Sequence, residues 1–219
     1  MGLRYCEKKI KIVSLDCGSK LLMMMEDFKG HKKMERLIAT GKDLFWKYGI
    51  KRVSIEEICK ASEVSKMTFY KFFPNKIELA RTILRLVMDK AIIDFRQLIE
   101  SDCSFKEKVH QMFVMKLEGT KNISAEFIQD IYHNPKLGLM EDMEAYSQKS
   151  FQLFVDFLKE AQVQGRIRKE VKIEFILSYI NQMTHMMNDE ALMTHYESPQ
   201  DLIMESMNFL FYGLLPREL

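Results

Sequence analysis

The 219-residue chain contains 47% hydrophobic and 11% aromatic residues but only 4 Pro and 9 Gly. A disordered chain would be poorer in apolar side chains, and no runs of strand length are bounded by clusters of turn residues. The composition therefore favours an all-α protein of one or two domains. The longest apolar run, LLMMM, is far shorter than the roughly 20 residues that span a bilayer, and the N-terminus lacks the apolar core of a secretory signal. We expect a cytoplasmic protein that contacts no membrane.

Cysteine and histidine are scattered along the chain. The 4 cysteines show neither a CxxC pair nor a Cys/His pair at zinc-ligand spacing, which is typical of reduced cysteines in a cytosolic protein. The histidines of the C-terminal part share no HxxxH spacing. We therefore expect no bound metal.

Charge is distributed unevenly along the chain. Residues 1–85 carry 19 Lys and Arg against 10 Asp and Glu, and residues 86–219 carry 14 against 21, so net charges of +9 and −7 add up to the total of +2. A basic front on an acidic body indicates that the front contacts a polyanion. Chance clustering of solvated charges would give the same numbers, so the charge needs the support of a motif.

The N-terminal part begins with a segment of no sustained period. Residues 1–29 are expected to form a tail or a basic arm, and translation could also start at the methionines just before the first helix. Over residues 31–48 apolar side chains recur with a 3-4-3 spacing, which predicts a helix. Gly49 is well placed to end it.

Capping signals mark three further helices. Ser54 followed by Glu57 is the signature of a capping box at the start of the second helix. Ser65 begins the third helix, and Asn75 begins a fourth that extends to about Glu100.

The remainder of the chain is also expected to be helical and to contain no internal repeat. Ser198, Pro199 and Gly213 are expected to be the N-cap, first residue and C′ residue of the last helix. About nine helices are predicted in all, and the later ones span residues 104–120, 124–131, 137–164, 172–188 and 199–212.

The second and third helices are short and separated by a three-residue gap, which predicts a helix-turn-helix. Phe69 and Phe73 are four residues apart and would pack inward with Val64 of the turn. In such a unit the second helix presents its other face to the major groove. Lys, Tyr and Thr suit phosphate and base-edge contacts. That outward face would carry Lys66, Met67, Tyr70 and Lys71, with Thr68 nearby. A helix-turn-helix that is only a packing unit remains the alternative, but the basic front half favours DNA.

The stretch LFWKYGIKRVSIEEICKASEVSKMTFYKFFPNKIEL resembles the N-terminal domain of TetR-family transcriptional regulators. The matching residues are Leu44, Phe45, Gly49, Ser54, Ile58, Val64, Ser65, Lys66, Thr68, Phe69, Tyr70, Phe73, Lys76 and Leu79. The sequence departs from the family where Glu63 and Met67 stand, because the family often has Gly at both positions. We expect Glu63 to occupy a positive-φ turn and Met67 to offer an apolar contact to a thymine methyl.

The resemblance implies an all-α homodimer with a helix-turn-helix domain over residues 30–77. It also implies a C-terminal domain over residues 78–219 that dimerises and binds a small-molecule effector. Ser54, Tyr70 and Lys76 would contact phosphates. Lys32 and Lys33 would be flanking phosphate contacts or simply an exposed charged helix end. The complete candidate set for contact with double-stranded DNA is Ser54, Ser65, Lys66, Met67, Thr68, Tyr70, Lys71, Lys76, Lys32 and Lys33.

The C-terminal helices carry wide apolar stripes, which the resemblance assigns to a dimer interface. An ordinary monomer core is the alternative. A two-fold dimer would read the two halves of an inverted-repeat operator, about 34 Å apart. The candidate interface residues are Phe175, Tyr179, Met187, Leu202, Ile203, Met207, Leu210 and Phe211.

The chain contains 17 Met, and Met-rich walls adapt to varied apolar ligands. A stripe of Met and aromatic residues is also what a plain core requires, so only some of the candidates are expected to touch a ligand. The candidate pocket residues are Met112, Phe113, Phe127, Tyr132, Met143, Tyr146, Phe151, Phe154 and Met183.

We therefore expect a DNA-binding repressor that a small, largely apolar ligand releases from its operator. The alternative is a helical protein-binding adaptor, or an activator whose helix-turn-helix does not repress. No GxGxxG, P-loop, HExxH or GxSxG motif is present, so neither an enzyme nor a cofactor is expected.

Overall fold

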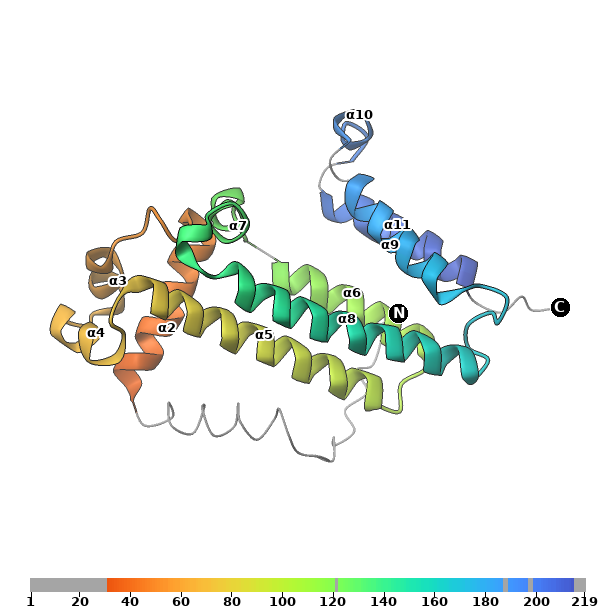
Figure 1. The fold of residues 1–219 in the computed structure, drawn as a ribbon, viewed down its shortest axis with the longest axis horizontal. Coiled ribbons are helices and arrows are strands. Elements are labelled where there is room, and N and C mark those ends of the chain that lie inside the picture. The colour runs from red at the N-terminus through yellow and green to blue at the C-terminus, as the bar shows by residue number, and fades with distance from the viewer. Residues whose placement is uncertain (1–30, 121, 187–188, 197–198, 215–219) are drawn as a thin grey trace, which may run out of the picture. The chain divides into compact units, whose positions relative to one another are not determined.

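The computed structural model describes residues 31–120, 122–186, 189–196 and 199–214. These residues form ten α-helices and one 3₁₀ helix, and they contain no strand (Figure 1). The predicted all-α fold is therefore confirmed, whereas the predicted tail at residues 1–29 lies outside the described residues. The elements are α2 (Lys32–Tyr48), α3 (Ile55–Ser62), α4 (Lys66–Phe72), α5 (Lys76–Glu100), α6 (Phe105–Thr120), α7 (Ala125–Tyr132), η1 (Pro135–Leu137), α8 (Met140–Val163), α9 (Ile173–Met186), α10 (Glu190–Met193) and α11 (Pro199–Leu214).

Most helix starts follow the predicted capping residues. The Asn75 side chain accepts hydrogen bonds from the backbone N–H groups of Ile77 and Glu78, at 2.8 and 2.9 Å. The last helix differs from expectation, because Gly213 lies within α11 and does not terminate it. Its predicted N-cap, Ser198, lies outside the described residues. The single-turn helix α10 was not predicted.

The chain divides into two compact units. The first contains the described residues up to Ser101 together with Gly119–Lys149, and the second contains Asp102–Glu118 and the described residues from Ser150 onward. The predicted boundary at residue 77 does not coincide with a division between these units. The first unit instead combines the helix-turn-helix with all of α5, with α7 and with the beginning of α8.

One hydrophobic core holds the first unit together. Phe45 of α2, Phe69 of α4 and Leu79 of α5 are completely buried in it. Gly41 lets α2 approach α5, because a Cβ atom there would lie 2.9 Å from Leu79 Cδ2. Phe127 of α7 belongs to the same core, so α7 completes the domain that carries the helix-turn-helix.

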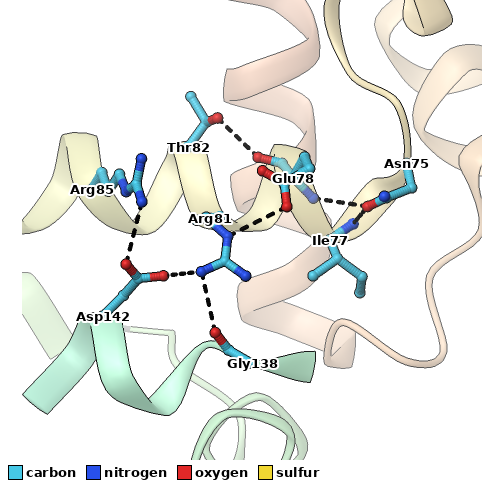
Figure 2. A network of polar contacts seen from close by, with 8 residues as sticks. All are labelled: Asn75, Ile77, Glu78, Arg81, Thr82, Arg85, Gly138 and Asp142. Atoms are coloured by element: carbon cyan, nitrogen blue, oxygen red, sulfur yellow. Dashed lines mark hydrogen bonds and ion pairs between the residues drawn. The ribbon is translucent and has the colours of Figure 1, made fainter. Parts of the chain in front are cut away.

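Polar contacts add to this core between α5 and the start of α8 (Figure 2). The guanidinium of Arg81 forms an ion pair with Asp142 and donates a hydrogen bond of 3.1 Å to the carbonyl of Gly138. Arg85, one turn further along α5, lies 3.3 Å from the same carboxylate. These contacts fix the first turn of α8 to α5.

The second unit has an aromatic core of its own. Phe105 of α6 stacks on Phe157 of α8, and Phe113 packs edge-on against Phe211 of α11 with ring centroids 5.4 Å apart. All four rings are buried. None of the described helices is long and apolar enough to cross a membrane.

Candidate nucleic-acid interface

The helix-turn-helix consists of α3, a three-residue turn and α4. Ser54 caps α3 with a complete capping box, because its hydroxyl accepts from the Glu57 N–H at 3.2 Å while its own N–H donates to the Glu57 carboxylate at 2.7 Å. The hydrogen bonds from the backbone and hydroxyl of Ser54 hold the pKa of Glu57 below its usual value. The capping box predicted from the sequence is therefore confirmed.

The turn between the two helices requires a left-handed residue. Glu63 has φ 52° and ψ 39°, which confirms the expected positive φ. The N–H of Val64 then donates to the carbonyl of Cys59 at 3.0 Å and closes the end of α3. The Glu63 side chain is exposed and forms an ion pair with Arg36 of α2. Glu63 thus adopts a strained backbone conformation, and its side chain links the turn to α2.

The two faces of α4 divide as the sequence predicted. Phe69 and Phe73 are buried against Val64, whereas 79% of Met67 and 54% of Tyr70 are exposed. Lys66 and Lys71 are exposed as well, and Thr68 is half-buried. The hydroxyl of Ser65 accepts a hydrogen bond of 3.2 Å from the Thr68 N–H and caps the helix. We call the exposed side chains of Lys66, Met67, Tyr70 and Lys71 the reading face.

An acidic side chain that the sequence analysis missed lies beside the reading face. Lys66 forms an ion pair with Glu56 of α3. The hydrogen bond with Lys66 lowers the pKa of Glu56, and the same contact raises the pKa of Lys66. Lys66 is therefore charged but already paired, and a phosphate would have to compete with Glu56 for it.

Lys76 is placed differently from the prediction. Its ammonium donates hydrogen bonds of 2.7 Å to the backbone carbonyls of both Lys51 and Val53. Burial lowers its pKa, and the charges of Asp130 and Glu57 act in the opposite direction. In this structure Lys76 supports the loop between α2 and α3, so a phosphate contact from it remains a prediction.

The two lysines at the start of α2 are exposed. The side chains of both Lys32 and Lys33 lie at the surface. The ring of the preceding residue, His31, packs against Phe72 of α4 with ring centroids 5.5 Å apart. The N-terminus of α2 is thereby placed next to the end of α4.

The residues predicted to line a pocket do not gather in one environment. Phe127 is 3% exposed and packs on Trp46 of α2 with ring centroids 4.3 Å apart, so it belongs to the core of the first unit. Phe113 is buried against Phe211, whereas Tyr132 and Phe151 are 45% and 54% exposed. Met112, Met143, Tyr146 and Phe154 are half-buried, and the side chain of Met183 lies outside the described residues.

The predicted dimer residues separate into two groups. Leu202, Leu210 and Phe211 are buried within the second unit. Phe175 is 62% exposed, and its ring lies 6.4 Å from that of half-buried Tyr179.

Two exposed aromatic residues of α11 were missed by the sequence analysis. Phe209 is 72% exposed and Tyr212 is 68% exposed, and the spacing of apolar residues did not distinguish them from their buried neighbours. Met207 of the same helix is half-buried. Met187 and the side chain of Ile203 lie outside the described residues.

The geometry defines a class of protein. A capped support helix, a tight turn and a short second helix with exposed Lys, Tyr and Met side chains form a helix-turn-helix that can enter a major groove. Residues 37–83, which contain it, match the family described as "Bacterial regulatory proteins, tetR family".

Similar proteins agree with this match along most of the chain. The HTH-type transcriptional repressor KstR2 of Mycobacterium tuberculosis is 19% identical over 68% of this chain and 76% of its own length. The solved structure of the ketosteroid transcriptional regulator KstR2 from the same organism is 16% identical, with a TM-score of 0.57 over 84% of this chain and 95% of that chain.

Two further proteins extend the comparison. The uncharacterised HTH-type transcriptional regulator YdgC of Bacillus subtilis is 24% identical over 86% of this chain and 96% of its own length. The structure of a TetR-family transcriptional regulator from Cytophaga hutchinsonii is 12% identical, with a TM-score of 0.65 over 87% of this chain and 98% of that chain. Residues 37–83 therefore match the DNA-binding domain of the TetR family, and the chain is similar to TetR-family transcriptional regulators over most of its length.

Proposed function

We propose that the protein is a repressor that binds an inverted-repeat operator as a homodimer and leaves it when a small molecule binds. The observation that carries DNA binding is the reading face on α4, where a 79% exposed Met67 and a 54% exposed Tyr70 stand between two lysines. Such a face offers charges to phosphates and an apolar group to thymine methyls. The protein would act in the cytoplasm, where operator DNA lies.

Dimerisation is supported by the aromatic side chains that the second unit leaves exposed. Phe175 of α9 and Phe209 and Tyr212 of α11 present large apolar surfaces to solvent, and half-buried Tyr179 lies beside Phe175. Aromatic side chains are enriched at the buried centres of protein interfaces. The expected partner is a second copy of this chain, because a two-fold arrangement presents two reading faces to two half-sites.

Release by a ligand requires that the ligand bind the two conformations with different affinity. Helix α5 is the candidate connecting element, since its first turn packs in the helix-turn-helix core and it continues to Glu100. Near its far end, the Nε atom of Arg96 is buried and has no hydrogen-bond partner among the described residues. A buried donor without a partner costs about 1–3 kcal/mol. An effector with an apolar body and an acidic group would supply the missing acceptor.

Selection of bound duplexes from a randomised library tests DNA recognition directly. An enriched inverted repeat whose binding weakens steeply with salt supports a dimeric regulator. Tyr70→Ala should weaken binding to all duplexes about equally, and Met67→Gly should change the preferred sequence. The adaptor alternative is favoured instead if no sequence is enriched and binding ignores salt.

The effector proposal has a separate test. Medium-chain fatty acids, matched with their methyl esters, are titrated into the protein–operator complex while DNA release is followed. Release by the acids alone, abolished in Arg96→Met, supports an acidic effector. Release by acids and esters alike, or unchanged release in Arg96→Met, excludes Arg96 as the anchor.

A further inference from the structure

The loop between α2 and α3 carries a cluster of positive charge that lies outside the reading face. Lys47, at the end of α2, and Lys51 and Arg52, in the loop, are all exposed. The Lys47 ammonium lies 5.0 Å and the Arg52 guanidinium 4.9 Å from the ring centroid of Tyr48. Among the described residues none of the three cations forms a salt bridge. We call Lys47, Lys51 and Arg52 the basic loop.

The backbone of the basic loop is held from both sides. The N–H of Lys51 donates to the Asp130 carboxylate of α7 at 2.8 Å, and the carbonyl of the same residue accepts from Lys76 of α5 at 2.7 Å. Lys76 also holds the carbonyl of Val53. The Lys51 residue therefore has both of its backbone polar groups bound by charged side chains.

The hydrogen bond between Lys51 and Asp130 places demands on the residues around it. Asp130 is only 8% exposed, and a buried carboxylate is unfavourable unless it is hydrogen-bonded. Gly49 is needed beside it, because Gly49 has φ 80° and a Cβ atom there would lie 2.9 Å from the Asp130 Oδ2 atom. At the N-cap of α7, the N–H of Ser124 donates to the carbonyl of Trp46 at 2.8 Å. A loop that only connects two helices on the surface requires none of these contacts.

The basic loop lies next to the N-terminus of α3, which favours contact with phosphate. Ser54, the N-cap of α3, lies two residues after Arg52, and helix N-termini attract phosphate. Two cations held against one aromatic ring lose less conformational freedom on binding than free side chains do. The loop can therefore add phosphate contacts at little further cost in entropy.

We propose that Lys47, Lys51 and Arg52 form a second phosphate-contact surface that binds the DNA backbone beside the bases read by α4. Asp130 is its positioning residue, because its carboxylate fixes the Lys51 backbone. The basic loop contributes affinity and register for any sequence, whereas the reading face on α4 supplies preference among bases. The inference uses the DNA binding of the chain but neither the effector nor the sign of regulation.

Salt titration on a fixed duplex tests the surface. Each phosphate contact contributes about −0.9 to the slope of log K against log salt. Lys51→Gln and Arg52→Gln together should make the slope of a bound dimer less negative by up to about 3.6, two contacts in each of two protomers. The base preference should stay that of the parent. The matched control is Lys42→Gln, which removes an exposed lysine of α2 that also lies over a ring, that of Trp46. A parental slope in the double variant overturns the proposal.

The role of Asp130 has its own readout. Asp130→Ala should make the slope less negative by up to about 1.8, the share of Lys51 in two protomers. It should add little when combined with the double loop variant, since both act on the Lys51 phosphate. Asp130→Asn should restore the slope, because an amide oxygen still accepts from the Lys51 N–H. Circular dichroism of Asp130→Asn establishes folding if Asp130→Ala is unstable. A parental slope in folded Asp130→Ala, or additive losses, would leave the basic loop in place and exclude the positioning role.

Discussion

Replacement of Phe127 by Ala should lower the free energy of unfolding of the domain that carries the helix-turn-helix. The Phe127 ring is 3% exposed and lies against Trp46, so the substitution removes nearly all of its packing from the core of the first unit. Buried Phe→Ala replacements cost about 3–5 kcal/mol, and an offset aromatic pair adds about 0.5–1.5 kcal/mol beyond its buried area. We expect a loss of about 3–5 kcal/mol, with operator binding weakened only as far as the folded fraction falls.

Trp46 is the only tryptophan, so its fluorescence reports on this contact. With a slope of about 1–3 kcal/mol per molar urea, a loss of 3 kcal/mol lowers the unfolding midpoint by at least about 1 M. Ile128→Ala is the matched control on α7, because 41% of Ile128 is exposed and its loss should cost under about 1 kcal/mol. A Phe127→Ala midpoint no lower than that of Ile128→Ala, with unshifted emission, would refute the packing of α7 on α2.

Variants at three positions test the helix-turn-helix. Ser54→Ala should cost about 0.5–2 kcal/mol of stability, measured by urea unfolding, and should return the pKa of Glu57 toward its usual value in an NMR titration. Because the folded-state pKa of Glu57 is the lower one, the stability linked to it is present above the unfolded Glu pKa and is lost as pH falls through the folded value. A pKa unmoved by Ser54→Ala would disprove that linkage. Glu63→Val should lower the free energy of unfolding by about 1–2 kcal/mol, because the backbone at this position has φ 52°. Glu63→Gly should leave the stability nearly unchanged, because the relief of backbone strain offsets the greater entropy of the unfolded chain and the loss of the exposed ion pair with Arg36. Equal stability of the two variants would show that the turn is not left-handed. Met67→Lys should raise the affinity for all duplexes and lower the preference for thymine. Selection from the randomised library measures that preference, and a preference equal to that of the parent would contradict the contact of Met67 with a thymine methyl.

The parts of the fold that depend on neighbouring residues were predictable from the sequence. A capping box joins residues three apart, so Ser54 with Glu57 marked the start of α3. The αL conformation of Glu63 was expected from the resemblance, because TetR-family sequences often have Gly at that position. The division of α4 into buried and exposed faces followed from helical spacing, with Phe69 inward and Tyr70 outward.

Contacts between distant residues could not be predicted in the same way. An apolar stripe shows which helix face is apolar, but it does not show whether that face meets its own chain or solvent. Phe209 and Phe211 lie two residues apart on α11, yet one is 72% exposed and the other is buried. The contact of Asp130 with Lys51 spans 79 positions, and no spacing rule connects them. The hydrogen bonds of Lys76 to two distant carbonyls are likewise invisible in the sequence.

The sharing of one core by the helix-turn-helix and residues 119–149 limits how this regulator can be taken apart and recombined. The chain passes between the two units at three places, so no single cut separates a complete operator-reading module from the rest. A chimera joined at residue 101 would pack the α7 of another protein against Trp46 and Gly49 of this chain. That α7 would have to supply a ring in the place of Phe127, beside Trp46, and a carboxylate in the place of Asp130, beside Gly49. Functional hybrids should therefore need a matched graft of residues 119–149, and operator specificity in this protein would evolve more readily by changes on α4 than by exchange of whole domains.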